Sequence, residues 1–363
     1  MAKKIRAGGM WSATEMGEYQ MSFYLQKKSA LVAATATTVM FTMTSLAAAE
    51  SVNWNLSVWG KSRSSTRNIE GLAAEVAKKT GDQFKIKIHY GGLSKPKENL
   101  DGIKIGAFQM AVMCNFYHPG KTPTMGGLDL PFLPISHLGV RQAVEEAYYK
   151  HPAVIKDLAR WGAMFVMGGG LQQYEFMGSG KPPLTLSDWK GRRVRIGGGM
   201  AKAMALLGAV PTTVPSPEVY QMMERGAVDA VGFPYYAFAA FKLPAISKWF
   251  TGNMALGTVG CPTMANIKAF NKLSKEYQDI LMNARFAGYE LSRTSFEAAD
   301  KRVVPGFRKV LQEIRYDDAT MADFRKIAAR PIWDNWVKEA TAKGVPAQEL
   351  LDLILATAKK ANK

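Results

Sequence analysis

The stretch GRRVRIGGG, residues 191–199, carries the side chain with the clearest capacity for ligand chemistry. Val194 and Ile196 alternate as in a strand and are expected to face the core, which leaves Arg195 on the opposite face near the strand's C-terminal end. Open α/β sheets bind ligands at that end. A guanidinium there could hold a carboxylate through two parallel hydrogen bonds, each contributing about 1.5–3 kcal/mol. The pattern alone still favours an ordinary surface arginine, because most arginines are exposed.

The glycines after this strand also suggest a phosphate site, but their spacing argues against one. A dinucleotide fingerprint starting at Gly197 needs glycine at position 202, where Lys202 stands, and no G-x-x-x-x-G-K-[ST] motif occurs. A serine-hydrolase elbow needs G-x-S-x-G, and the sequence around Ser179 lacks the first glycine. The four histidines form no H-E-x-x-H motif or other ligand cluster. The sequence therefore predicts no metal and no cofactor.

Length and composition indicate a folded protein of about two domains, since the chain has 363 residues of which 47% are hydrophobic. The formal charge of +17 first suggests nucleic acid or a membrane surface as partner. The basic residues are dispersed, however, with no run of five or more. We therefore favour a solvated basic surface and expect no nucleic-acid partner.

The N-terminal region has the pattern of a secretory signal peptide. Lys27 and Lys28 precede an uncharged, largely apolar run over residues 30–46, and Ala47–Ala49 form an A-x-A cleavage pattern. We expect cleavage after Ala49, with Met1 and Met21 both open as the start of translation. No later apolar segment is long enough to cross a bilayer, so we expect an exported, periplasmic protein whose mature chain does not insert directly into the membrane.

Hydrophobic periodicity predicts alternating strands and helices. The expected elements are strands over residues 52–58, 83–90 and 108–114, helices over 65–81 and 97–106, and a Pro/Gly-rich loop over 119–135. A second α/β unit begins at Arg192, and a proline-free helical pattern from Ser274 to about Arg302 is long enough to cross two domains. The C-terminal third reads as mostly helical. This alternation of strands and helices predicts α/β sheets of mostly parallel order.

Two further local features carry expectations. Ser216 is expected to cap a helix whose first turn holds Pro217 and Glu218 and which Gly226 closes. Cys114 and Cys261 are the only cysteines. Their separation does not predict a disulfide, although export permits one, and we favour two buried free thiols.

Several motifs together resemble the central signature of the solute-binding proteins of TRAP (tripartite ATP-independent periplasmic) transporters, the dicarboxylate-type DctP family. They are GRRVR at Gly191–Arg195, LGAVPT at Leu207–Thr212, PEVY at Pro217–Tyr220, GAVDA at Gly226–Ala230, and Pro234. Upstream, residues 91–112 and the LDLPFLP stretch at 128–134 also resemble family segments. The resemblance covers most of residues 52–300, in order. The combination is specific, whereas no single motif would be.

The resemblance implies a two-domain periplasmic-binding-protein-like α/β fold, with strands crossing between domains and a long helix spanning both. The implied boundaries are 1–49 for the N-terminal extension and signal peptide, 50–172 plus 259–298 for domain I, and 173–258 plus 299–363 for domain II. Such a protein is not an enzyme. It captures a small organic anion in the interdomain cleft, closes around it, and delivers it to a small four-helix membrane subunit and a large permease. The family arginine that grips the ligand carboxylate falls on Arg195.

Departures from the family pattern suggest an apolar or aromatic ligand body. Many members have asparagine before the proline that matches Pro234, where this chain has Phe233, and polar or acidic residues where Cys114 stands. The expected ligand-binding residues are Arg195, Phe233, Tyr236, Ser216, Glu175, Tyr174, Asn115, Cys114, His118, Tyr117, Trp59 and Lys95. Phe238 and Phe241 are expected to belong to the core instead.

Two other classes of protein stay open at this point. One is a secreted enzyme acting on a carboxylated substrate, with Arg195 as anchor and Glu175 or His118 as acid–base, although no nucleophile or cofactor site accompanies them. The other is a basic protein that binds nucleic acid or a charged surface. Its binding would weaken steeply with salt and would not need Arg195.

Overall fold

The computed structural model describes residues 51–118 and 120–363, so the predicted signal peptide lies outside the described residues. The first sheet has the strand order β2-β1-β3-β10-β4. Its strands are β1 (Val52–Val58), β2 (Phe84–Tyr90), β3 (Met110–Val112), β4 (Ala163–Met167) and β10 (Thr263–Asn266). β1 pairs in parallel with β2 and β3, whereas β10 lies antiparallel between β3 and β4. Trp54, Leu56 and Val58 of β1 are buried, as their alternation predicted.

The second sheet has the order β11-β9-β5-β8-β6-β7. Its strands are β5 (Glu175–Gly178), β6 (Arg193–Arg195), β7 (Val210–Thr212), β8 (Ala230–Phe233), β9 (Trp249–Thr251) and β11 (Gln312–Ile314). β5 is antiparallel to both neighbours, and the other pairs are parallel. We call the parts of the molecule built on the two sheets the first and second lobes. The parallel order of β6, β7 and β8 brings their C-terminal ends to one edge.

Two extended segments connect the sheets and run against each other. Residues 168–174 lead from β4 to β5, and residues 252–262 return from β9 to β10. Backbone N–H groups of Leu171 and Tyr174 donate to the carbonyls of Val259 and Gly257, and Gly170 forms an isolated antiparallel bridge with Gly260. We call this pair of segments the crossing ribbon. It confirms the expectation that strands pass between the two lobes.

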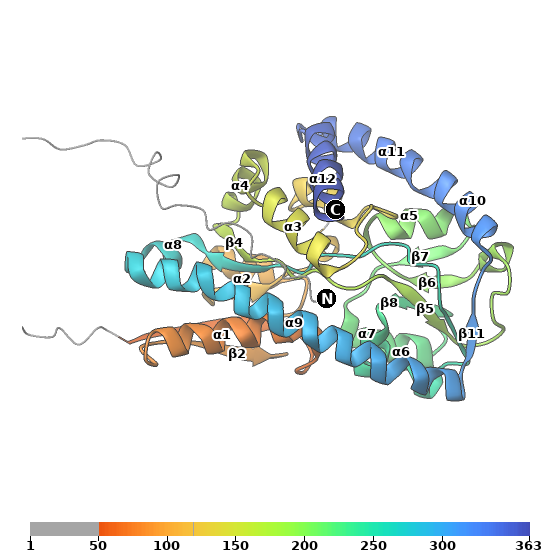
Figure 1. Ribbon diagram of the computed structural model, residues 1–363, viewed down its shortest axis with the longest axis horizontal. Helices are drawn as coiled ribbons and strands as arrows, with labels where there is room; N and C mark the ends of the chain where they lie inside the picture. Colours follow the sequence, from red (N-terminus) through yellow and green to blue (C-terminus); the bar gives the residue numbers. More distant parts are fainter. Residues whose placement is uncertain (1–50, 119) are drawn as a thin grey trace, which may run out of the picture. The chain divides into compact units, whose positions relative to one another are not determined.

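Helix α9 (Lys275–Val310) has 36 residues and runs past both sheets (Figure 1). Ser274 caps it by accepting a hydrogen bond from the Tyr277 backbone N–H at 3.2 Å. The N-terminal half of α9 packs closely on α1 (Arg67–Lys79). Gly288 lies so near α1 that a side chain at this position would meet the backbone of Asn68. The C-terminal half of α9 packs its buried Phe307 against Phe250 and Phe238 of the second lobe.

The predicted end of this helix near Arg302 was wrong. The helix continues through Pro305 to Val310, although proline removes one hydrogen bond of the helical ladder. Burial of Phe307 among aromatic rings beyond the proline stabilises the last turns. The sequence pattern alone does not show that such tertiary contacts stabilise the helix beyond the proline.

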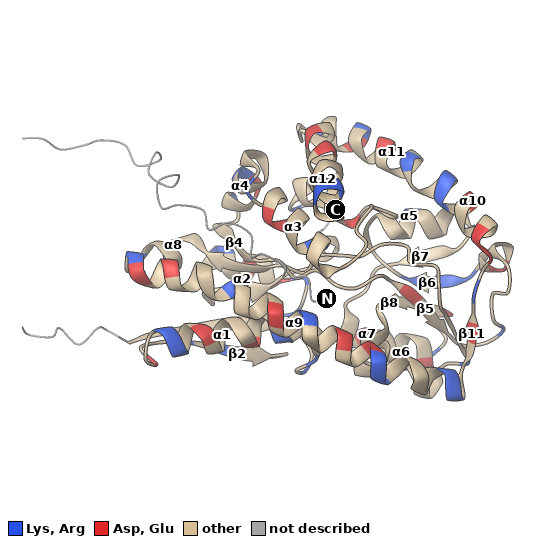
Figure 2. Ribbon diagram, viewed as in Figure 1, with Lys and Arg blue, Asp and Glu red and all other residues tan. Residues whose placement is uncertain are grey.

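The remaining helices cover the sheets and connect their strands. They are α2 (Asn99–Ile105), α3 (Leu138–Tyr148), α4 (Pro152–Ala159), α5 (Gly198–Leu206), α6 (Val219–Glu224), α7 (Tyr235–Ala240), α8 (Ile267–Asn271), α10 (Asp318–Ala328), α11 (Arg330–Thr341) and α12 (Ala347–Ala361). The C-terminal helices return toward the first lobe, because α12 packs against α3 and Trp333 of α11 donates to the Pro131 carbonyl at 2.7 Å. Basic and acidic residues are interspersed along α9 to α12 (Figure 2). Within the described ranges, no helix is both long and apolar enough to cross a bilayer.

Candidate functional site

Arg195 lies at the C-terminal end of β6 and is completely buried. Its guanidinium is fixed by backbone carbonyls: Nε and Nη2 donate to the Val214 oxygen at 3.0 and 2.7 Å, and Nη1 reaches the Gly232 oxygen only at 3.4 Å. In the described part of the chain, no carboxylate lies within 4.0 Å of it. A buried cation without an anionic partner is costly. The site is therefore suited to receive an anion.

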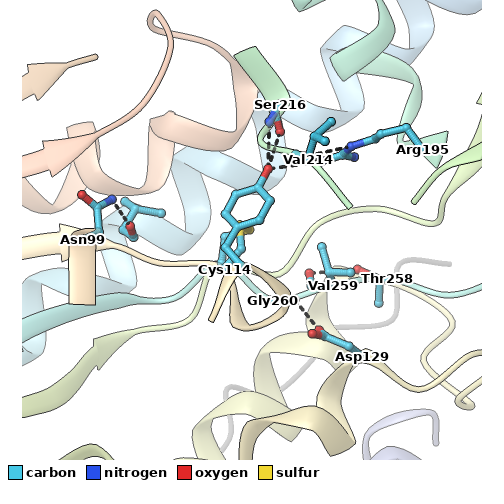
Figure 3. Close-up of a disulfide and its surroundings, with 12 residues drawn as sticks. Asn99, Cys114, Asp129, Arg195, Val214, Ser216, Thr258, Val259 and Gly260 are labelled. Atoms are coloured by element: carbon cyan, nitrogen blue, oxygen red, sulfur yellow. Dashed lines mark hydrogen bonds between the residues drawn. A yellow bond between two sulfur atoms is a disulfide. The ribbon is translucent and has the colours of Figure 1, made fainter. Parts of the chain in front are cut away.

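The Tyr117 hydroxyl joins Arg195 to the first lobe. Tyr117 belongs to a 3-10 turn (Asn115–Tyr117) that follows β3, and its oxygen accepts from Arg195 Nη2 at 3.2 Å and from the Ser216 backbone N–H at 2.9 Å. Both lone pairs are thereby used, so its own proton is donated to Ser216 Oγ at 2.9 Å. Arg195 and Ser216 converge on this point in Figure 3.

The expected capping role of Ser216 was wrong. Pro215 occupies the cap position of the short 3-10 turn Ser216–Glu218 that precedes α6, and no side-chain cap hydrogen bond forms. The Ser216 hydroxyl is instead bonded to Tyr117, 99 residues away in the sequence. A local pattern cannot anticipate a long-range partner that competes for the hydroxyl.

A small pocket with a cavity volume of about 30 Å³ lies beside this group of hydroxyls and is lined from both lobes. Seven of the predicted ligand-binding residues line it: Trp59, Cys114, Tyr117, Tyr174, Ser216, Phe233 and Tyr236. Arg195 lies behind its wall, in contact with Tyr117 and with its Cζ 4.5 Å from the Phe233 ring centroid. The structure thus brings the predicted arginine and most of the predicted lining together.

Aromatic rings make up much of the pocket wall. Phe233 and Phe241 are stacked with centroids 5.4 Å apart, and Trp59 meets Tyr117 edge-on at 5.6 Å. Phe241 had been expected in the core but lines the pocket, because it ends α7 where the helix faces the first lobe. Phe238 is buried in the core, as expected. Such a wall suits a flat apolar body.

Arg63 is a pocket residue that the sequence did not single out. It follows β1 in the loop before α1, and its Nη1 donates to the carbonyls of Trp59 and Lys61 at 2.8 and 2.9 Å. Burial lowers its pKa below the ordinary value, and the nearby Tyr236 hydroxyl acts in the opposite direction. The available signal was its position on a loop after a strand, where binding residues concentrate.

Four predicted residues lie elsewhere. Asn115 and His118 line a separate pocket next to Gly198 and Trp336, and burial lowers the pKa of His118 to about 4. Glu175 faces a different groove. Its carboxylate accepts from Thr251 Oγ1 at 2.6 Å and from two backbone N–H groups, while burial raises its pKa.

Lys95 lies on the loop before α2, where its backbone N–H donates to Glu98 at 3.2 Å, and it does not line the pocket. Glu175 and His118 therefore do not meet as an acid–base pair at the Arg195 site.

Cys114 and Cys261 form a disulfide in the pocket wall (Figure 3), so the expectation of two free thiols was wrong. The physical reason is the topology of the first sheet. β3 and β10 are paired neighbours with Val112 opposite Thr263, and each cysteine lies two residues beyond that pair. A separation of 147 residues in the sequence hides this proximity.

Two α/β lobes, joined by a crossing ribbon and a long helix and enclosing a pocket between them, define a two-lobed solute-binding protein. The sequence matches the family described as bacterial extracellular solute-binding protein, family 7 (DctP), over residues 56–339, and the chain belongs to this family. The predicted family and fold class are confirmed. The family consists of solute-binding receptors, so the alternative of a secreted enzyme is not supported.

Curated relatives and solved structures agree with this assignment. A solute-binding protein of Albidiferax ferrireducens is 28% identical over 80% of this chain and 86% of its own. A monocarboxylate 2-oxoacid-binding periplasmic protein of Nostoc is 25% identical over 88% and 90%. A TRAP solute-binding protein of Bordetella bronchiseptica with bound mandelate is similar in fold, with a TM-score of 0.76 at 22% identity over 85% of this chain and 99% of that one. A benzoate-bound TRAP protein of Rhodoferax ferrireducens gives 0.76 at 17% identity over 86% and 98%.

Proposed function

We propose that this protein captures a small organic acid with an aromatic or apolar body in the periplasm and delivers it to the small and large membrane subunits of a TRAP transporter. The observation that carries the proposal is Arg195, a buried guanidinium behind an aromatic pocket that has no carboxylate partner among the residues the structure describes. The solved relatives with bound mandelate and benzoate support this ligand class.

A bound ligand would accept hydrogen bonds from donors of Arg195 that now contact the protein. Arg195 Nη1 donates to the Gly232 oxygen only at 3.4 Å, and its Nη2 donates to the Tyr117 hydroxyl at 3.2 Å. A ligand carboxylate would take these donors, because charge-assisted hydrogen bonds are roughly twice as strong as neutral ones. Contacts to both lobes would then favour the closed arrangement, since only that arrangement makes them together.

The test is thermal unfolding of residues 50–363 with a panel of acids: aromatic monocarboxylates, 2-oxo acids, aliphatic dicarboxylates, sugar acids and sulfonates. A ligand at 100 times its Kd should add about 2.7 kcal/mol of stability. Arg195→Gln should weaken binding by at least about 100-fold, because two charge-assisted bonds of about 1.5–3 kcal/mol each are lost.

The matched control is Arg193→Gln, which removes the same charge from an exposed position of the same strand and should leave the ligand-induced shift unchanged. Binding of polyhydroxylated sugar acids alone, or binding that survives Arg195→Gln, would contradict the proposal.

A further inference from the structure

The pocket holds a second guanidinium that the carboxylate site does not use. Arg63 is held in place before any ligand arrives, because its Nη1 donates to two backbone carbonyls and its backbone N–H donates to Thr66 Oγ1 at 3.0 Å. Gly60 has a φ of +74°, and a side chain there would meet the Arg63 guanidinium at 3.0 Å. The loop is thus shaped to lay this guanidinium along its own backbone.

The two guanidiniums mark different ends of the aromatic wall. Arg195 lies over Phe233, with Cζ 4.5 Å from the ring centroid, and Arg63 lies over Phe241 at 5.9 Å. Phe233 and Phe241 are stacked on one another, so each cation is associated with a different ring of the pair. The Tyr117 hydroxyl accepts a hydrogen bond from Arg195 and also interacts electrostatically with Arg63, whereas the Tyr236 hydroxyl interacts with Arg63.

Neither cation has an anionic partner among the described residues. Within residues 51–118 and 120–363, no lining residue of the pocket is an aspartate or glutamate, and no carboxylate lies within 4.0 Å of either guanidinium. Glu70, the nearest acid along the helix that follows Arg63, is bonded to Tyr90, Ser62, Thr66 and Arg67 instead. Two positive charges with aromatic rings between them match a dianion that has an aromatic body.

Resting on the proposed function, we infer that Arg63 forms a second anion-binding pole and that the ligand is an aromatic acid with two anionic groups, one for each arginine. A purely structural Arg63 would need only the two carbonyl bonds of its Nη1. In the described chain its Nε and Nη2 have no backbone acceptor, so apart from the contact with the Tyr236 hydroxyl these donors can serve a ligand.

Calorimetric titration of residues 50–363 with benzoate and with 1,2-, 1,3- and 1,4-benzenedicarboxylate tests this inference. At least one dicarboxylate should bind about tenfold more tightly than benzoate, since a second ion pair with a partly desolvated arginine contributes on this scale. Arg63→Gln should abolish that preference, so that the dicarboxylates bind the variant no more tightly than benzoate does. Arg63→Lys, which keeps a charge, should retain part of the preference.

Matched controls separate the possible outcomes. Lys61→Gln removes an exposed charge two residues away and should change neither affinity. The inference is overturned if wild type binds benzoate as tightly as every dicarboxylate, or if Arg63→Gln weakens both ligand types equally at an unchanged Tm. In both cases Arg195-dependent benzoate binding would preserve the proposed function. If the wild type binds no aromatic acid at all, this inference is overturned as well, whereas the proposed function would stand if an aliphatic apolar acid binds in an Arg195-dependent way.

Discussion

The disulfide between Cys114 and Cys261 should contribute strongly to stability, and its removal is a direct test of the structure. The bond joins residues separated by 147 positions in the sequence. In the chain-entropy treatment, closing a loop of this length lowers the entropy of the unfolded chain enough to stabilise the fold by about 5 kcal/mol at 25 °C. An unfolding entropy of about 2.1 cal/mol/K per residue converts this into a loss of about 7 °C in Tm for a chain of this size.

The assay compares oxidised wild type, reduced wild type and the Cys114→Ala/Cys261→Ala double variant by thermal unfolding. Reduced wild type keeps both sulfur atoms, so its difference from the oxidised protein isolates the cross-link from the loss of buried volume. The double variant should have a Tm no higher than that of reduced wild type, because both cysteines are buried and their truncation also removes contacts. Reductant should not affect the double variant.

Two results would refute this reasoning. Titration of two free thiols in the denatured, unreduced protein would show that the bond does not form. A Tm change below about 1 °C on reduction, with the bond formed in the unreduced protein, would show that the loop-closure argument does not apply, because strain in the native state or structure in the unfolded state then cancels it.

Further predictions concern pH and glycine. Burial lowers the pKa of His118 to about 4, so as the pH falls this imidazole is protonated in the unfolded chain before it is protonated in the folded protein. The stability of the fold should therefore decrease between about pH 6.5 and pH 4. His118→Asn should flatten the dependence of Tm on pH in this range. Burial raises the pKa of Asp129 to about 7, so stability should fall as pH rises from about 4 to 7; Asp129→Asn should raise Tm more at pH 8 than at pH 5. An unchanged profile in either variant would contradict the assigned shift. A side chain at Gly169 would lie 1.9 Å from the Cys261 carbonyl oxygen, so Gly169→Ala should cost at least about 2 kcal/mol in chemical denaturation. Gly306 of α9 has open space around it, so Gly306→Ala should instead stabilise the protein by about 0.5–1 kcal/mol, and equal effects of the two changes would contradict this account.

Elements that depend on local pattern were predictable from the sequence. The expected strand over 52–58 coincides with β1, and the expected helix over 65–81 contains α1. Alternation and amphipathic spacing specify these elements because one face of each must be buried. Arg195 was predicted on family resemblance, since residue pattern alone favoured a surface position, and it is in fact fully buried.

Features that depend on long-range pairing were not predictable in the same way. The disulfide requires β10 to lie next to β3, and the Ser216 hydroxyl bonds Tyr117 across the two lobes. Glu175, which had been predicted at the pocket, is held by Thr251 and by backbone N–H groups of the segment after β9. Arg63 was missed because its place in the pocket depends on how the first lobe meets α7. The spacing of residues along the sequence does not reveal such long-range contacts.

The position of β10 in the first sheet has a consequence for how the chain reaches its native state. β10 lies between β3 and β4, yet it follows both in the sequence, after the whole stretch from residue 168 to residue 262 has built most of the second sheet. As the chain folds, the first sheet therefore has a gap between β3 and β4 until β10 inserts, and Cys114 has no partner until then. The two lobes cannot mature one after the other. We expect slow, concerted acquisition of structure, with the edges of β3 and β4 dependent on chaperones until the returning strand fills the gap.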